Sequence, residues 1–236
     1  NECWALLPGS PQTTLPVAQA TGNGFLYSLA PSITPALTGT ASRVYDGTTG
    51  ATLLSGNFTA AGAVDGDAVT LAWTGSAYGD RNAGTGKAVT ATGISASASN
   101  SGAPVYGYAL ASTTATANIG EITPAPLTVT AQADTRVYDG TTASSAAPLL
   151  MSGVTYDAVG TAATQGFDNR NAGTGKNLTA SGLVMADGNG GANYAISYVD
   201  NVAGVITPAA LSIVADSTER PVETPNPPFT ATYVGL

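Results

Sequence analysis

Arg43-Val44-Tyr45-Asp46-Gly47-Thr48-Thr49 occurs a second time, unchanged, as Arg136-Val137-Tyr138-Asp139-Gly140-Thr141-Thr142. Each copy is followed by a second shared string, Arg-Asn-Ala-Gly-Thr-Gly-Lys, at residues 81–87 and 170–176. Each repeat then ends on Gly-x-Ile-Thr-Pro, at residues 120–124 and 204–208. Three signatures that appear twice in the same order indicate an internal tandem repeat, which has to be recognised before any single motif is interpreted.

The repeat has a period of about 90 residues. Solenoid repeats are shorter, roughly 20–45 residues, whereas about 90 residues is the size of a small independent domain. We therefore predict four segments: the tail of a preceding module or an irregular segment (1–35), a first module (36–125), a second module (126–209) and the truncated start of a further module (210–236). Short linkers that contain proline should join them end to end as a stiff rod. Such partial copies at both ends also suggest part of a longer chain.

Apolar residues alternate with polar ones, which is the pattern of β-strands. The clearest case is Leu127, Val129 and Ala131, which alternate with Thr128 and Thr130. Other strands are expected at 69–74, 88–92, 105–110, 117–122, 194–198 and 211–215. Because no helical spacing is sustained over three turns, the prediction is an all-β fold of tandem small domains. We favour an Ig-like β-sandwich. A β-grasp-like sheet, in which the first and last strands pair in parallel, is the alternative.

Composition excludes several functions. Charged residues make up 9% of the chain and the formal net charge is -8, so nothing offers the clustered cations that nucleic acid requires. There is no histidine and one cysteine, Cys3, which rules out a histidine triad, a Cys/His zinc site and an intramolecular disulfide. No apolar run approaches a membrane span. We therefore expect no enzyme, no cofactor and no membrane span; a carboxylate-pair glycosidase is the only catalytic class left open.

The three signatures together resemble those of the YDG domain, and the resemblance covers about residues 36–236. The final segment, with Asn226-Pro227-x-Phe229 and Tyr233-x-Gly235-Leu236, resembles the related MBG module. YDG domains occur in tandem in large bacterial surface proteins of the filamentous haemagglutinin and two-partner-secretion type. The resemblance therefore implies an extracellular stalk at the bacterial cell surface, used in cell adhesion or biofilm formation. It implies no catalytic residues.

The expected partners of such a stalk are neighbouring modules of the same chain, other copies in a fibre, and host glycan or protein. The alternative function is that the modules themselves bind glycan or host protein. Binding modules usually expose clustered aromatic residues, but here the aromatic residues fit strand positions that face a core. These are Trp73, Tyr106, Tyr108, Tyr194 and Tyr198. This pattern favours the stalk.

The repeated turn supplies the candidate structural residues. They are Tyr45, Asp46 and Gly47 in the first copy and Tyr138, Asp139 and Gly140 in the second. We interpret each tyrosine as a half-buried anchor and each aspartate as a brace of an Asp-Gly turn.

Lys87 and Lys176 are the only lysines, and each closes an Asn-Ala-Gly-Thr-Gly run. Glycines let the backbone turn tightly and direct each lysine at its own module. We predict that Lys87 lies near Asp46, and Lys176 near Asp139. An intramolecular Lys–Asn bond, which some surface adhesins carry, is the covalent alternative.

A calcium site is the last candidate. Asp187, Asn189 and Asp200 offer the oxygen atoms that calcium prefers. Because Asp-Gly-Asn is common in plain turns and has no counterpart in the first module, we favour a turn without metal.

Overall fold

The computed structural model describes residues 3–5, 25–27 and 30–235, and among them it contains no α-helix. Regular structure is almost entirely β-strand, with one short 3-10 turn at Ser55–Asn57. The prediction of an all-β chain of tandem small domains is confirmed. Most of the predicted segment 1–35 lies outside the described residues, apart from two short parallel strands, β1 (Cys3–Ala5) and β2 (Phe25–Tyr27), and the start of β3. No described helix is long and apolar enough to cross a membrane.

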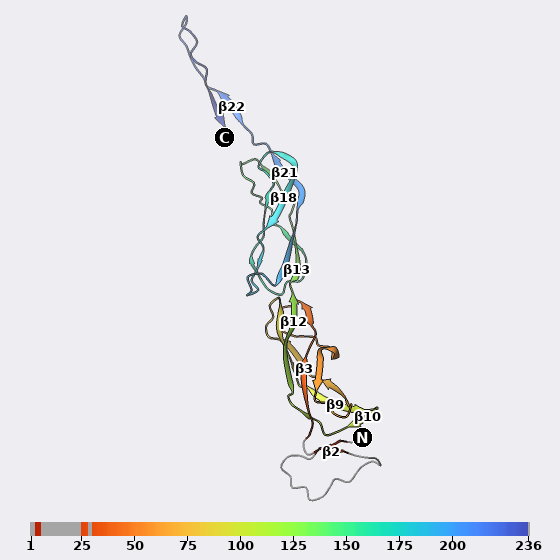
Figure 1. Cartoon of the computed structure of the whole chain (residues 1–236). Helices are drawn as coiled ribbons and strands as arrows, with labels where there is room; N and C mark the ends of the chain where they lie inside the picture. Colours follow the sequence, from red (N-terminus) through yellow and green to blue (C-terminus); the bar gives the residue numbers. More distant parts are fainter. Residues whose placement is uncertain (1–2, 6–24, 28–29, 236) are drawn as a thin grey trace. The chain divides into compact units, whose positions relative to one another are not determined.

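The chain divides into two units (Figure 1). Unit 1 comprises residues 1–125 together with residues 187–194, and unit 2 comprises residues 126–186 and 195–236. The segment Asp187–Tyr194 therefore lies within the second sequence repeat but belongs to the first spatial unit. The spacing of the repeats did not predict that residues 187–194 belong to unit 1.

Apart from the β1–β2 pair, the described strands of unit 1 lie in three sheets. The first contains β11 (Ala109–Leu110), β3 (Ser32–Leu37) and β5 (Phe58–Ala61), in that order. The second contains β4 (Ala41–Val44), β12 (Thr114–Thr123), β8 (Gly84–Thr92) and β7 (Gly75–Tyr78). The third contains β10 (Ala103–Val105), β9 (Ser95–Asn100) and β6 (Ala68–Ala72).

Unit 2 repeats the central arrangement. One sheet contains β15 (Leu149–Ser152), β13 (Ala125–Thr130) and β20 (Tyr194–Val199). The other main sheet contains β14 (Thr135–Val137), β21 (Asn201–Thr207), β18 (Gly173–Ser181) and β17 (Thr164–Phe167). Two pairs complete the unit: β16 (Val159–Thr161) with β19 (Val184–Met185), and β22 (Ser212–Ala215) with β23 (Ala231–Val234).

The four-stranded sheets of the two units share one topology. In each, the second strand of the repeat pairs in parallel with the last: β4 with β12, and β14 with β21. The last strand also pairs antiparallel with the strand that contains Gly-Thr-Gly-Lys. The β-grasp alternative also expected a parallel partner for the last strand, but it named the first strand, whereas here the partner is the second. The strands are nevertheless divided between separate sheets, as a sandwich requires.

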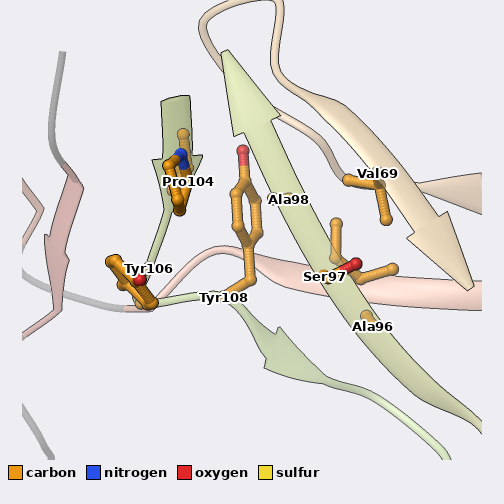
Figure 2. A pocket seen from close by; sticks show the side chains of 10 residues that line it. Val69, Ala96, Ser97, Ala98, Pro104, Tyr106 and Tyr108 are labelled. Atoms are coloured by element: carbon orange, nitrogen blue, oxygen red, sulfur yellow. The ribbon is translucent and has the colours of Figure 1, made fainter. Parts of the chain in front are cut away.

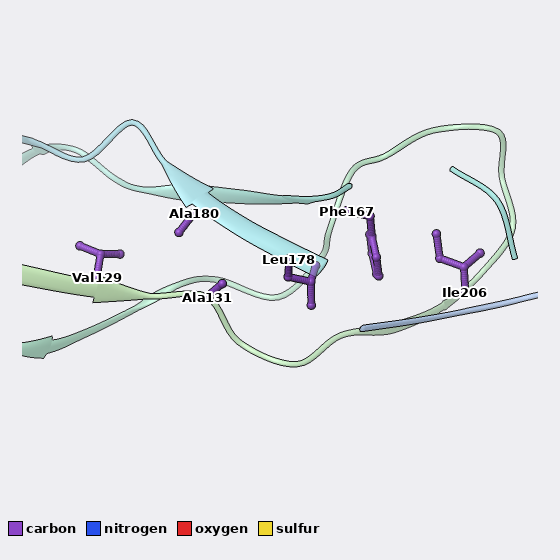
Figure 3. Packing of buried hydrophobic residues seen from close by; sticks show 6 residues of the cluster. All are labelled: Val129, Ala131, Phe167, Leu178, Ala180 and Ile206. Atoms are coloured by element: carbon purple, nitrogen blue, oxygen red, sulfur yellow. The ribbon is translucent and has the colours of Figure 1, made fainter. Parts of the chain in front are cut away.

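The core of unit 2 joins its two main sheets (Figure 3). Val129 and Ala131 come from β13 and the residue that follows it, and they pack with residues of the other sheet. Those residues are Phe167, Leu178, Ala180 and Ile206. The predicted alternation at Leu127, Val129 and Ala131 is confirmed, since all three side chains are buried.

One predicted strand is interrupted. Instead of a strand over 105–110, β10 ends at Val105 and β11 begins at Ala109. Gly107 has a φ of 101°, which breaks the extended backbone and its alternation of faces. The prediction that Tyr106 faces a core was therefore wrong, because 73% of its surface is exposed.

Candidate functional site

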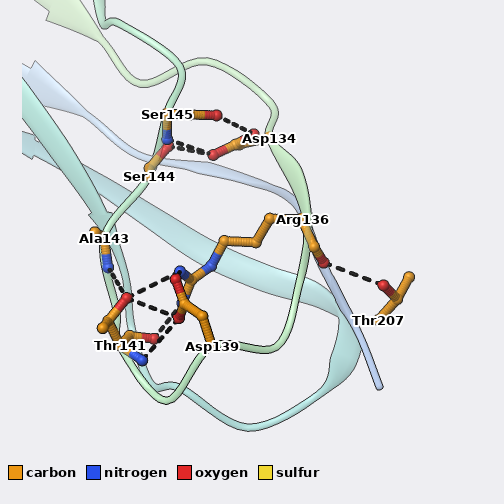
Figure 4. A network of polar contacts seen from close by, with 8 residues as sticks. All are labelled: Asp134, Arg136, Asp139, Thr141, Ala143, Ser144, Ser145 and Thr207. Carbon is orange, nitrogen blue, oxygen red and sulfur yellow. Dashed lines mark hydrogen bonds and ion pairs between the residues drawn. The ribbon is translucent and has the colours of Figure 1, made fainter. Parts of the chain in front are cut away.

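The Arg-Val-Tyr-Asp-Gly-Thr-Thr stretch folds into a polar turn, shown for the second copy in Figure 4. Asp139 Oδ1 accepts hydrogen bonds from the backbone N–H and the hydroxyl of Thr141, both at 2.8 Å. Arg136 Nη1 donates to Asp139 Oδ2 at 2.7 Å, and Nη2 donates to the carbonyl of Thr141. Gly140 adopts a φ of 81°, which explains the glycine at this position. The motif is a self-contained brace.

The first copy makes the same contacts. Arg43 Nη1 donates to Asp46 Oδ1 at 2.7 Å, and Asp46 Oδ1 accepts from the N–H of Thr48 at 2.9 Å. Gly47 has a φ of 76°. Aspartate, arginine and threonine of the repeated stretch therefore bond to one another in both units, and the glycine adopts the same positive φ.

The arginine of each turn also stacks on an aromatic ring. The guanidinium carbon of Arg43 lies 5.0 Å from the ring centroid of Tyr78, and that of Arg136 lies 5.2 Å from the centroid of Phe167. These distances are typical of a cation–π interaction. This role of Tyr78 and Phe167 was not predicted from the sequence. The available signal was an aromatic residue three positions before Arg-Asn-Ala-Gly in both repeats.

The glycine of Gly-x-Ile-Thr-Pro lies against the same ring. A Cβ atom added to Gly120 would come within 2.7 Å of the Tyr78 ring and 2.9 Å of the Lys87 carbonyl oxygen. A Cβ atom on Gly204 would meet the Lys176 carbonyl at 2.8 Å and the Phe167 ring at 2.9 Å. The first and third signatures therefore contact one aromatic residue in each unit, and the lysine carbonyl of the second signature lies beside the same glycine.

Replacing Gly120 with alanine should therefore destabilise unit 1. The new methyl group meets a backbone oxygen that cannot easily move, and such overpacking costs about 1–3 kcal/mol. Urea denaturation of the full chain measures the change. Gly86→Ala separates steric overlap from backbone strain. Its Cβ would meet nothing within 4 Å, but its φ is 63°, which strains any residue other than glycine. An unchanged midpoint for Gly120→Ala would contradict the proposed contact.

The predicted partner of each lysine, the aspartate of the Tyr-Asp-Gly turn, was wrong. Lys87 Nζ lies 2.5 Å from Asp80 Oδ1, whereas Asp46 is paired with Arg43. The turn between β7 and β8 brings Asp80 back over the lysine that follows it by seven residues. The Asp46 carboxylate is instead bound by Arg43, which lies only three residues before it in the sequence.

Lys176 shows the same geometry with a different partner. Its Nζ donates to Asn169 Oδ1 at 2.5 Å and lies 3.5 Å from Asp168 Oδ1, while Asp139 is paired with Arg136. Asn169 occupies the position of Asp80. The covalent Lys–Asn alternative therefore stays a prediction for Lys176. An intact mass short by one ammonia would reveal it.

Asp187 organises the segment Asp187–Tyr194. Its carboxylate, 1% exposed, accepts hydrogen bonds from the backbone N–H groups of Asn189, Gly191 and Asn193 at 2.7–2.9 Å. Burial alone raises the pKa of Asp187, but these donors outweigh it and leave the pKa below its ordinary value.

The structure does not gather the three calcium candidates into a metal-binding group. The Asp187 carboxylate is used by its own loop, and Asp200 Oδ2 accepts from Asn177 Nδ2 at 2.8 Å. Asn189 Nδ2 donates to Asn193 Oδ1 at 3.1 Å. Within the described part of the chain, no three Asp, Glu, Cys or His side chains are placed to hold a metal ion.

Within unit 1, the segment Asp187–Tyr194 packs on the turn that carries Arg-Asn-Ala-Gly. Asn193 Oδ1 accepts from the Ala83 N–H at 2.7 Å, and Asn193 Nδ2 donates to Asn82 Oδ1 at 3.2 Å. Arg81 Nη2 donates to the Asp187 carbonyl at 3.0 Å. The ring of Tyr194 meets Tyr45 edge to face at 5.5 Å.

These contacts explain why the two repeated tyrosines differ. Tyr45 is 1% exposed rather than half-buried, whereas Tyr138 is 37% exposed. The Asp187–Tyr194 segment covers Tyr45, and the described residues of unit 2 place no such ring on Tyr138.

A cavity of about 420 Å³ opens beside β9 and β10 (Figure 2). Its lining includes Tyr106, Tyr108, Pro104, Val69 and Ala98. The Tyr108 hydroxyl donates to Asp67 Oδ2 at 2.8 Å, which holds this ring in place. Tyr106 remains exposed at the rim. No acid, base or cysteine side chain lines this cavity.

Acid should destabilise the fold. Burial raises the pKa of Asp46, but hydrogen bonds from Thr48 and the charge of Arg43 outweigh it and leave the pKa below its ordinary value. For Asp139 the largest cause is the Thr141 backbone N–H, and the net shift is also downward. A lowered folded pKa contributes stability that is present above the unfolded value and lost as pH falls through the folded value.

We expect the free energy of unfolding to decline below about pH 4 and to stay nearly flat from about pH 5 to 7, because the chain has no histidine. Urea denaturation across this range measures it. Asp139→Asn should reduce the acid-dependent part. A stability that rises on acidification below pH 4 would contradict the assigned shifts.

The model of one protein family, the YDG domain, matches the chain at residues 30–116 and 123–201. Comparison with curated proteins found no match, and neither did comparison with solved structures.

Proposed function

Because the chain belongs to the YDG domain family, we propose that its repeats are structural modules of an extracellular bacterial surface protein. In this role they form part of a stalk that projects a distal binding region for adhesion or biofilm formation. The parent protein is of the filamentous haemagglutinin type, and residues 210–236 begin an MBG-type module. The partners are neighbouring modules and other copies in a fibre.

The observation that carries this proposal is where the repeated residues make their contacts. Arg136, Asp139 and Thr141 bond to one another, and Gly204 packs under Phe167. Residues kept in both repeats therefore support the fold, as expected of a spacer module. Catalysis usually needs titratable groups gathered in a pocket, and the cavity at Tyr106 offers none besides tyrosine hydroxyls. We propose accordingly that the chain is not an enzyme.

Surface display tests the stalk. The full chain is placed between a membrane anchor and a terminal binding domain on bacterial cells. We expect cells to capture a large immobilised ligand better than cells that carry a Gly/Ser linker of equal residue number, because such a linker is a flexible coil. Equal capture by the two cell types would reject the stalk.

The second candidate function is that the modules bind glycan or host protein. Tyr106 favours it, because this exposed ring stands beside Pro104 and Tyr108 at the cavity rim, and aromatic surfaces suit sugar rings and proline. Glycan and host-protein arrays probed with the full chain decide the matter. Saturable binding that is lost in Tyr106→Ala would establish this alternative. No saturable binding would leave the stalk.

A further inference from the structure

The repeated turn is covered in unit 1 and exposed in unit 2, although its residues are the same. In unit 1, Tyr45 is buried under the ring of Tyr194. In unit 2, Tyr138 is 37% exposed and borders a cavity of about 620 Å³. Asp139, Asn171, Ala172 and Ala209 also line this cavity.

Besides Tyr138, three residues of this lining have counterparts in unit 1 that bond to Asn193. Asn171 and Ala172 occupy the positions of Asn82 and Ala83, which bond to the side chain of Asn193. Ala209 occupies the position of Ala125, whose N–H donates to the Asn193 carbonyl at 2.9 Å. Asn171 and Ala172 are exposed in unit 2.

We infer that this cavity is an acceptor site for the Asp187–Tyr194 segment of another copy of the second repeat. The incoming tyrosine packs edge to face on Tyr138. The incoming asparagine accepts from the Ala172 N–H and donates to the Asn171 carboxamide. Its carbonyl accepts from the Ala209 N–H.

The cavity offers no unpaired charge to the incoming segment. Asp139 is its only charged lining residue, and its carboxylate already accepts from Arg136 and Thr141. An incoming segment therefore needs no cation. In the incoming segment, the carboxylate equivalent to Asp187 likewise already accepts hydrogen bonds from backbone N–H groups of the same segment.

This inference rests on the proposed stalk for its biological setting, but its test does not require a cell surface. A longer chain is prepared in which residues 125–236 follow Pro208 directly, so that a second copy of the repeat comes after the same Ile-Thr-Pro-Ala junction. Hydrogen exchange at the Ala172 amide, followed by NMR, reports whether the cavity is filled. Linkage makes docking intramolecular and raises the effective concentration.

We expect exchange at Ala172 to slow by at least about tenfold relative to the 236-residue chain. Asn193→Ala in the added copy alone should restore the original rate. An unchanged Ala172 rate, while the Leu178 amides of both copies stay protected, would overturn the inference and leave the stalk untouched. Equal ligand capture in the surface-display test would reject the stalk but would not affect the acceptor site at Tyr138.

A second measurement covers the case in which the longer chain does not fold. A cyclised peptide with the sequence of residues 186–195 is added to the 236-residue chain. We expect saturable shifts of the Ala172 and Asn171 amides, weakened about tenfold when the asparagine before the peptide tyrosine is alanine. Shifts confined to Ala83, or none, would overturn the inference.

Discussion

Replacing Asp187 with alanine should lower the free energy of unfolding of unit 1 by about 3–5 kcal/mol. The carboxylate is 1% exposed and is the acceptor for three backbone N–H groups. Alanine leaves those donors buried without an acceptor, and each buried donor that loses its partner costs about 1–3 kcal/mol. The loss should also release Asn193 from the Ala83 N–H.

Denaturation of the full chain by urea measures the total effect, and hydrogen exchange at Ala83 locates it. Asp187→Asn is the matched control, because it keeps one carbonyl oxygen and the size of the side chain; its effect should be smaller. Asp200→Ala should have little effect, because residue 200 is exposed. A change below about 1 kcal/mol for Asp187→Ala would show that the loop does not depend on its carboxylate.

Leu178→Ala should destabilise unit 2 by about 2–5 kcal/mol. Leu178 is 0% exposed and packs in the cluster that joins the two main sheets (Figure 3). Removing three carbon atoms loses their burial and leaves a cavity that the neighbouring strands can only partly close. Urea denaturation gives the magnitude.

Val184→Ala is the control, because 40% of Val184 is exposed and little is lost on truncation. Val89 is a fully buried residue of β8 and belongs to unit 1. Val89→Ala should therefore destabilise unit 1 and leave amide exchange at Leu178 unchanged. Equal losses for Leu178→Ala and Val184→Ala would show that the core does not rely on Leu178.

The sequence predicted the tandem all-β fold because the signals were local. Two identical stretches define a repeat, and the alternation at Leu127, Val129 and Ala131 identifies the buried face of β13. The Asp-Gly turns were predictable for the same reason, since the positive φ of Gly47 and Gly140 depends only on the adjacent backbone.

Interactions between distant segments could not be predicted. Lys87 was assigned to Asp46 because both recur, yet the turn after β7 places Asp80 closer. Tyr106 was assigned to a core because alternation was extended through Gly107, whose positive φ ends it. The membership of residues 187–194 in unit 1 depends on contacts with Asn82 and Ala83, which no periodicity encodes.

The parallel pairing of β4 with β12, and of β14 with β21, determines how each unit responds to pulling force. Tension enters each unit through its first strand, β3 or β13, and leaves through its last strand, β12 or β21. Once tension passes to the second strand, it slides that strand along the last one. Their hydrogen bonds, including those from the Tyr45 and Tyr138 N–H groups at 2.8 Å, are then loaded together rather than one at a time. Resistance to such shear is governed by the rate of unfolding and not by the equilibrium stability. A unit of modest thermodynamic stability can therefore withstand drag, provided that this one pair of strands stays joined.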